Sequence, residues 1–492
     1  MDLVISGHLQ HDSEVRAIRD TIIRKRESLQ CIEREIAQLV ETKKEVEQDL
    51  VRLRIALAPH TGNHSFFPIE ILSRIFVSLA LDCGTVNFPL RRSGDVLPQL
   101  LVSHVCSHWR RVALHTPELW SDTQLFYTRH TTNDSIRLLQ RWLFRARYFP
   151  VTLLIKFDES FNGDGLTIAL QNILLPIQVK KLSLCLTYQI FMALSTLPES
   201  MLSGLSEIEL DLVFPDIQEN INMSTPHPLI STRLQFLSFR GVGFKTPAWF
   251  GPPHPSLSWS QLRSLTIGIY LGNGLHLVMG TLRQIPNLEA LDLGIVYDAD
   301  LDLLDPLTMP SLRTFSIQVE MATGIALDKI LRYFVCPTLT EFYFVVNPRG
   351  GDWTCETFGI LKQRYNMQEL REAMFVGNFS LPVSSFLRDA PMLLSLSLGR
   401  NAIMDDDAII GISNGTLGQF LTELDIKFAC DVGEVLGMVE ARKKMADSLI
   451  TNGCTWKEEI TIIKDVVIHT NENGYKDRVV ALKEAGINIT FK

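Results

Sequence analysis

A short apolar pattern returns ten times between Val179 and Ile426, and it constrains the fold more than any other feature. Each copy reads L-x-x-L-x-L with apolar substitutions, and successive copies start 23–31 residues apart. One such unit has too little apolar surface to fold alone, so the copies must stack to bury it. The central residues of the copies are Leu182, Ile208, Leu237, Leu265, Leu291, Phe315, Phe342, Ala373, Leu396 and Leu424.

The segments between the copies favour one architecture. Residues 274–284 and 325–334 have the apolar spacing of helices, so strands and helices alternate along the chain. Repeats of this pattern with a period of about 20–29 residues are typical of leucine-rich repeats. We therefore predict an α/β fold in which residues 150–428 form an irregular leucine-rich-repeat solenoid of about ten degenerate repeats. A β-sandwich is the alternative, but its turns recur every ~8–12 residues.

The chain after residue 428 leaves this pattern. Residues 434–453 and 474–486 have helical spacing, whereas 463–470 and 487–491 read as strands. A solenoid needs a cap over its last repeat, and an open sheet needs protection of its edge. We predict that 429–492 form an α/β capping unit that closes this edge.

The N-terminal region predicts a coiled-coil helix over residues 13–57. Apolar residues recur there with alternating spacings of three and four, without a Gly or Pro. Two lysines on the seam, Lys25 and Lys43, weaken it but help to fix the register. A second copy of the chain is one expected partner, and packing on the same chain is the alternative. The seam positions are Val15, Ile18, Ile22, Lys25, Leu29, Ile32, Ile36, Leu39, Lys43, Val46, Leu50, Leu53 and Leu57.

Two amphipathic helical segments follow, at residues 68–82 and 101–113, with a polar loop between them. They carry more apolar surface than two short helices can bury against each other, and such a surplus often marks a partner site. The second segment contains His104, Cys106 and His108. We predict no metal there, because on a continuous helix Cys106 lies about 200° from His104.

No arrangement of residues in this chain predicts catalysis. The glycines at 272–280 miss the spacings of phosphate-binding loops, and the run Asp405–Asp407 lacks the ligand spacing of a calcium loop. There is no G-x-S-x-G motif. We expect a non-catalytic protein without a cofactor or metal.

Composition excludes several other classes. The net charge of −8 argues against a general nucleic-acid binder, which requires a basic face. No apolar stretch approaches the ~18–20 residues of a membrane span. The eight cysteines are scattered singly, as is typical of reduced intracellular thiols. We therefore expect no nucleic-acid or membrane partner and a cytoplasmic and/or nuclear location.

Residues 65–122 resemble an F-box domain. The F-box pattern Leu-Pro-x-Glu-Ile/Leu-Leu-x-x-Ile-Phe corresponds to "FPIEILSRIF" at 67–76, with Phe67 in place of the first Leu. The later elements Val-Cys-x-x-Trp-Arg and Pro-x-Leu-Trp correspond to "VCSHWR" at 105–110 and "PELW" at 117–120. The order of coiled coil, small all-α F-box and leucine-rich repeats is similar to that of F-box proteins from mushroom-forming fungi.

This resemblance implies a function. F-box domains bind the Skp-type adaptor of SCF (cullin–RING) ubiquitin ligases, and a cullin scaffold is reached through that adaptor. The chain would then be the substrate-recognition subunit, with its repeats holding an unknown target protein. The resemblance implies an adaptor-binding surface formed or supported by Pro68, Ile69, Leu72, Ile75, Phe76, Leu101, Val105 and Trp109.

The strands of the repeats offer a surface for the target. Residues on either side of the central apolar residue point outward, onto the concave face. Acidic residues at both ends of the series suggest a basic target. The candidate substrate-binding residues are Glu207, Glu209, Asp211, Phe236, Arg240, Asp292, Tyr343, Glu423 and Asp425.

Two other non-catalytic functions stay open, whereas a hydrolase or transferase in residues 429–492 is disfavoured because that unit shows no nucleophile–base pattern. The chain could be a non-catalytic interaction scaffold whose F-box-like segment never engages a cullin complex. It could also be a repeat protein that inhibits an enzyme or binds a small ligand.

Overall fold

The computed structural model describes most of the 492 residues. The described ranges are 2–61, 67–82, 84–89, 97–128, 130–158, 166–174, 178–187, 194, 197–202, 204–212, 233–241, 259–271, 275–296, 305–320, 324–346, 355–377, 381–399, 404–427, 431–451, 460–469 and 474–491. The chain divides into two compact units. The first comprises Met1–Ser78 and Val102–Ala113, and the second Leu79–Leu101 and Leu114–Lys492.

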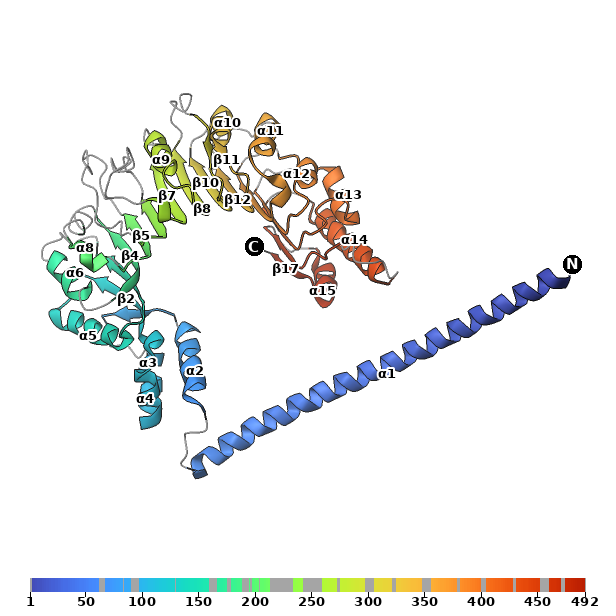
Figure 1. Cartoon of the computed structure of the whole chain (residues 1–492), viewed down its shortest axis with the longest axis horizontal. Helices are drawn as coiled ribbons and strands as arrows, with labels where there is room; N and C mark the ends of the chain where they lie inside the picture. The colour runs from blue at the N-terminus through green and yellow to red at the C-terminus, as the bar shows by residue number, and fades with distance from the viewer. Residues whose placement is uncertain are drawn as a thin grey trace. The chain divides into compact units, whose positions relative to one another are not determined.

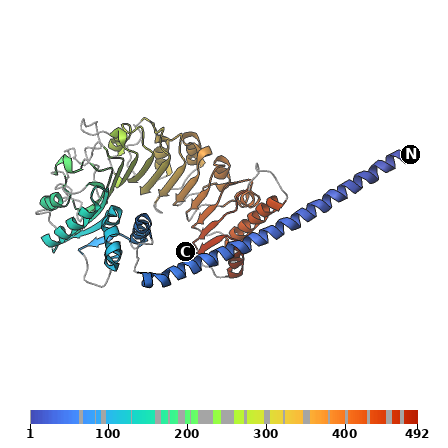
Figure 2. The same ribbon diagram turned by 60° about the horizontal axis from the view of Figure 1, so that its bottom comes forward.

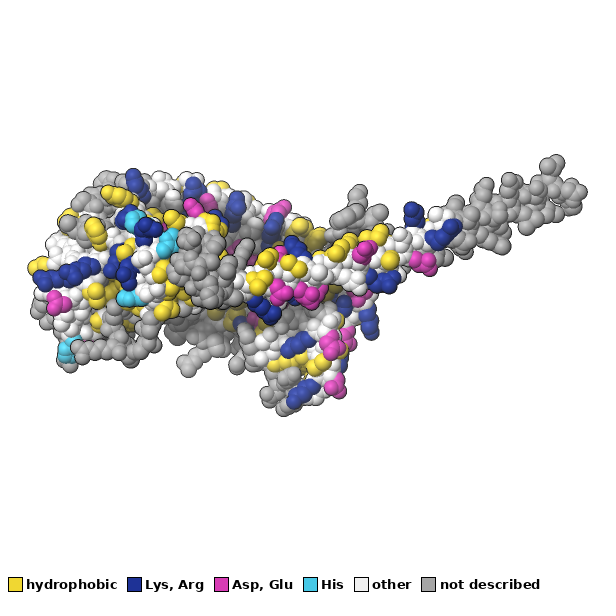
Figure 3. All heavy atoms as spheres, turned by 90° about the horizontal axis from the view of Figure 1, so that it is seen from below, with side chains coloured by type: hydrophobic (Ala, Val, Ile, Leu, Met, Phe, Trp, Pro, Cys, Tyr) yellow, Lys and Arg dark blue, Asp and Glu magenta, His cyan; other side chains and the backbone are white. Residues whose placement is uncertain are grey.

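Helix α1 (Asp2–Thr61) is a single helix of 60 residues. Its side chains are described for residues 21–22 and 24–53, and all of these are exposed, including the apolar seam from Ile22 to Leu53. Figure 3 shows hydrophobic and charged side chains next to one another along this part of α1. An exposed seam of this length is unusual for a helix that acts alone, because helical stability comes mainly from packing an apolar face.

Three short helices follow, α2 (Ile69–Asp82), α3 (Pro98–Val105) and α4 (Ser107–Leu114). The continuous helix predicted over 101–113 is wrong, because the chain breaks at Cys106. Cys106 Sγ accepts a hydrogen bond from the Trp109 backbone N–H at 3.4 Å, which caps the start of α4. Arg110 Nε donates to the carbonyl oxygen of Ser103 at 2.8 Å, which satisfies the end of α3.

The second unit contains a 15-stranded open parallel sheet. Apart from the short pair β9 (Leu307–Thr308) and β11 (Phe334–Val335), its described strands lie side by side in the order in which they occur along the chain. Its strands are β1 (Val86–Phe88), β2 (Asp122–Tyr127), β3 (Val151–Phe157), β4 (Val179–Leu186), β5 (Glu207–Leu212), β6 (Phe236–Gly241), β7 (Ser264–Leu271), β8 (Ala290–Val296), β10 (Thr314–Glu320), β12 (Glu341–Val346), β13 (Glu372–Val376), β14 (Ser395–Leu398), β15 (Glu423–Ile426), β16 (Asp465–Ile468) and β17 (Asn488–Phe491).

Parallel neighbours need crossover connections, and many of the described ones contain a helix. Figures 1 and 2 show the strands of this unit along a curve, with the helices on its outer side. The helices are α5 (Asn133–Leu143), α6 (Leu166–Leu174), α8 (Glu199–Leu202), α9 (Leu275–Leu282), α10 (Gly324–Tyr333), α11 (Cys355–Arg364), α12 (Val383–Asp389), α13 (Asp406–Asn414), α14 (Val432–Thr451) and α15 (Lys476–Glu484).

The ten repeated patterns coincide with ten strands, β4 to β8, β10 and β12 to β15. All three apolar residues of each copy are buried, at 3% exposure or less. Further strands join at both ends of the series. Buried residues occupy the same three positions around β2 and around β16, namely Trp120, Thr123 and Leu125 in the first case and Ile463, Val466 and Ile468 in the second.

A backbone hydrogen-bond pattern links successive repeats. The carbonyl oxygen of Arg313 accepts from the N–H groups of Thr340 and Glu341, at 2.8 and 2.9 Å. The carbonyl oxygen of Thr422 accepts in the same way from Lys464 and Asp465, at 2.7 and 3.2 Å. The C-terminal segment therefore extends the sheet by two parallel strands, β16 and β17, instead of closing its edge, and β17 forms the new edge.

One charged side chain is fully buried behind this end of the sheet. Arg442 of α14 donates hydrogen bonds to five backbone carbonyl oxygens, with distances of 2.7–3.4 Å. These carbonyls belong to Ile412 at the end of α13, to the turn 417–419 and to Thr461. Burial lowers the pKa of Arg442 to about 10. The guanidinium thus fixes the connection between α13 and β15.

Candidate interaction surfaces

The predicted adaptor-binding residues fall into two groups, one buried or half-buried and one exposed. Leu72 and Phe76 are buried, and the ring of Phe76 lies 5.1 Å from that of the half-buried Trp109. The contact between Phe76 and Trp109 joins α2 and α4, and Leu72 is buried on α2. Leu72, Phe76 and Trp109 are therefore mainly core, a distinction that their spacing could not make.

The other predicted adaptor residues are exposed. Pro68, Ile69 and Ile75 of the α2 region and Val105 of α3 all face solvent. Leu101, on the part of α3 assigned to the second unit, is exposed as well. The predicted set leaves out other exposed apolar residues of this region, among them Phe67 and Ile71. Ile71 lies four residues before Ile75, so the two share one face of α2.

The histidine and cysteine side chains of this region have separate environments. His104 is exposed, and His108 Nδ1 lies 3.3 Å from Arg111 Nη2. Cys106 caps α4, as its hydrogen bond from Trp109 indicates. Within the described ranges, no group of three His, Cys, Asp or Glu side chains could hold a metal ion.

The strand register of the second unit arranges polar side chains in rows across the concave face. One row contains Lys181, Glu207, Phe236, Ser264, Ala290, Thr314, Glu341, Glu372, Ser395, Glu423 and Asp465. The next contains Ser183, Glu209, Ser238, Thr266, Asp292, Ser316, Tyr343, Met374, Ser397 and Asp425. A third, beside β3 to β6, contains Lys156, Cys185, Asp211 and Arg240.

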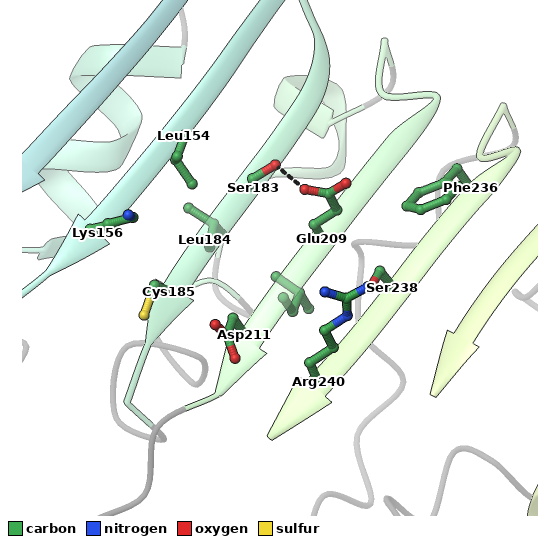
Figure 4. Close-up of a pocket in the computed structure, with 11 residues that line it drawn as sticks. Leu154, Lys156, Ser183, Leu184, Cys185, Glu209, Asp211, Phe236, Ser238 and Arg240 are labelled. Atoms are coloured by element: carbon green, nitrogen blue, oxygen red, sulfur yellow. Dashed lines mark hydrogen bonds between the residues drawn. The ribbon is translucent and has the colours of Figure 1, made fainter. Parts of the chain in front are cut away.

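A hollow of about 380 Å³ lies over β3 to β6. Five predicted residues lie on its strands, and four of them, Glu209, Asp211, Phe236 and Arg240, line it. Figure 4 shows Arg240 extending from β6 toward β5, and Lys156 on the other side of the hollow. Lys156 was missed because β3 precedes the first recognised repeat.

Two carboxylates at this end, those of Glu207 and Glu209, lie close to lysines. Lys181 Nζ lies 2.7 Å from Glu209 Oε1, and Ser183 Oγ donates to Glu209 Oε2 at 2.7 Å. Burial raises the pKa of Glu209, but these hydrogen bonds outweigh it, so the pKa is lower than usual. Glu207, the fifth residue, lies 3.9 Å from both Lys180 and Lys181. The acidic character expected here is therefore offset by lysines of the preceding strand.

A second hollow, of about 310 Å³, lies over β12 to β16 and is more acidic. The predicted residues Tyr343, Glu423 and Asp425 line it, together with Glu372 and Asp465, which the sequence interpretation missed. Tyr343 donates its hydroxyl to Glu372 at 2.7 Å, and burial and this bond raise its pKa. Asp425 Oδ1 lies 3.2 Å from His469 Nε2, and Asp425 Oδ2 lies 3.7 Å from Lys427 Nζ.

The nine predicted substrate residues thus fall into two groups on one face of the sheet. Glu207, Glu209, Asp211, Phe236 and Arg240 lie together on β5 and β6. Tyr343, Glu423 and Asp425 lie together around the second hollow, and Asp292 lies on β8 between the two groups.

No family model matches the chain, and no curated protein matches it either. In the part of the chain that the structure describes, no helix is long and apolar enough to cross a membrane.

Proposed function

We propose that this protein is the substrate-recognition subunit of an SCF (cullin–RING) ubiquitin ligase. The observation that carries the proposal is the coincidence of F-box-like motifs at 67–76 and 105–110 with apolar side chains that remain exposed there. Ile69, Ile75 and Val105 are not needed to fill the interior, and a hydrophobic partner would cover them. A Skp-type adaptor is the partner that the motifs imply.

We infer further that the sheet of the second unit is an irregular leucine-rich-repeat solenoid that binds the target protein. The regular burial of ten apolar patterns and the order of the strands support this inference. The concave rows would supply the contacts with the target. The protein itself would catalyse no covalent step but would raise the local concentration of the target near a ubiquitin-loaded enzyme.

The test is a pull-down of the intact chain with a Skp-type adaptor. The variant Ile75→Ser/Val105→Ser alters only exposed side chains, so it should stay folded by circular dichroism. We expect it to bind at least about tenfold more weakly than the parent, because a few anchor side chains dominate the affinity of such interfaces. The matched control is Ile410→Ser/Val480→Ser, which removes two exposed apolar side chains of α13 and α15 and should bind normally.

A parent chain that does not bind the adaptor would contradict the proposal and favour a scaffold outside any cullin complex. The exposed seam of α1 is the observation that supports this second candidate. We propose self-association through α1 for the ligase subunit and for the scaffold alike. Light scattering of the intact chain should then give a dimer, and Leu39→Lys on the seam should shift it toward the monomer.

A further inference from the structure

The end of α5 and the segment that joins it to β3 carry an exposed surface that neither the F-box resemblance nor the concave face includes. Its tip is Arg147-Tyr148, and its helical part contributes Arg141 and Phe144. Tyr148 is 92% exposed and Phe144 73%. Aromatic side chains of this size usually lose most of their exposure on folding, so two in one short segment are unexpected.

The backbone holds this tip in a strained turn. Arg147 has φ 54° and ψ −118°, and the Phe149 N–H donates to the Ala146 carbonyl oxygen at 2.9 Å. This is the geometry of a type II′ turn, whose first central position favours glycine. Arg147 is the only non-glycine residue with positive φ within the described ranges. Backbone strain of this kind is concentrated at functional sites, so Arg147 is a candidate binding residue.

The base of the turn is fixed by packing. Arg145 lies over the Trp120 ring, with its guanidinium carbon 4.5 Å from the ring centroid. Trp142 is buried against Trp120, with ring centroids 4.7 Å apart. The exposed side chains are thus presented from a rigid platform, which lowers the entropic cost of binding.

The charge of this surface is opposite to that of the chain. Residues 131–150 contain four arginines and one aspartate, whereas the whole chain has a net charge of −8. Asp134 is paired with Arg137 at 3.5 Å, and Arg145 is occupied by the Trp120 ring. Arg141 and Arg147 make no ion pair with the described residues. Figure 1 shows α5 in the second unit, at the left of the view.

We propose that Arg141, Phe144, Arg147 and Tyr148 form a docking site for an acidic segment of a partner protein. Guanidinium groups bind carboxylates with two parallel hydrogen bonds, and Arg and Tyr are enriched among the residues that dominate protein interfaces. The segment would place Asp or Glu against Arg141 and Arg147 and an apolar side chain against Phe144 and Tyr148. A nucleic acid is disfavoured as the occupant by the negative charge of the rest of the chain. This site does not rest on the proposed ligase function.

The experiment is a selection from a displayed library of short random peptides on the intact chain. We expect enrichment of peptides that combine Asp or Glu with an aromatic or aliphatic residue. Fluorescence anisotropy then gives the Kd of a selected peptide for the parent and for Arg141→Gln/Arg147→Gly. Glycine fits the backbone of residue 147, so this variant should remain folded. We expect its Kd to rise at least about tenfold.

The matched control, Lys476→Gln/Lys483→Gln, removes two exposed positive charges from α15 and should leave the Kd within about twofold. Selection of neutral or basic peptides would overturn the proposal. Undiminished binding by the arginine variant would overturn it as well. So would displacement of the peptide by a single-stranded oligonucleotide or by anionic lipid vesicles at lower concentrations than by free peptide.

Discussion

The helices at residues 67–113 and the parallel sheet use the same types of apolar residue in opposite ways. Along α2, Phe76 is 1% exposed, whereas its neighbour Ile75 is 46% exposed. In the sheet, by contrast, every apolar residue of the ten repeated patterns is buried. A strand inside the sheet has a neighbour on each side and a helix layer behind it. On α2, Phe76 faces inward and the adjacent Ile75 faces solvent, so this helix keeps apolar surface that its folding does not bury.

The largest expected effect comes from removing a buried aromatic side chain of the sheet. Phe315 is fully buried, and its ring lies 4.8 Å from that of Phe334 and 6.1 Å from that of Phe342. Phe315→Ala should lower the free energy of unfolding by about 3–5 kcal/mol, because it leaves a cavity. Denaturant unfolding followed by circular dichroism measures this. Ile75→Ser, at the exposed position of α2, should cost less than about 1 kcal/mol, and an equal cost would contradict the comparison.

A somewhat smaller effect is expected at Arg442, the charged side chain buried in the sheet unit. Arg442→Met fills similar space but leaves five carbonyl oxygens without their donor. We expect a loss of about 2–4 kcal/mol, because unsatisfied buried polar groups are costly. Thermal unfolding measures this loss, and the matched control is Lys443→Met, the same kind of change at the next position of the helix. Equal melting temperatures for the two variants would mean that the five hydrogen bonds contribute little.

The smallest effect concerns the concave face. The pKa of Glu209 is lower in the folded chain than its ordinary value of 4.5, so the ionised carboxylate adds stability above that pH. This contribution disappears as the pH falls through the lowered pKa. The parent should therefore exceed Glu209→Gln in stability by at most about 0.5 kcal/mol at neutral pH. Unfolding measured from pH 7 down to about pH 3 should show this difference shrinking; a difference that grows on acidification would contradict it.

Periodicity predicted the apolar interior of the sheet well, because each strand repeats the same three buried positions. It did not count β2 and β16 among the repeats, although Trp120 and Ile463 occupy the first position of the pattern there. The break at Cys106 could not be predicted from spacing, since a capping thiol leaves the apolar period intact. Likewise, the neutralisation of Glu209 depends on Lys181, which is 28 residues away and becomes its neighbour only through the strand register.

The spacing of the rows on the concave face would limit which residues of an extended target peptide can contact them. Neighbouring strands are about 4.8 Å apart, whereas an extended peptide advances about 3.3 Å per residue. A peptide lying across the strands would therefore come into phase with the rows about every third residue, after two strands. Its residues between these points would face the gaps between side chains. The sheet would thus contact about every third residue of an extended target. Glu209 and Thr266, which lie two strands apart in one row, would face two such residues.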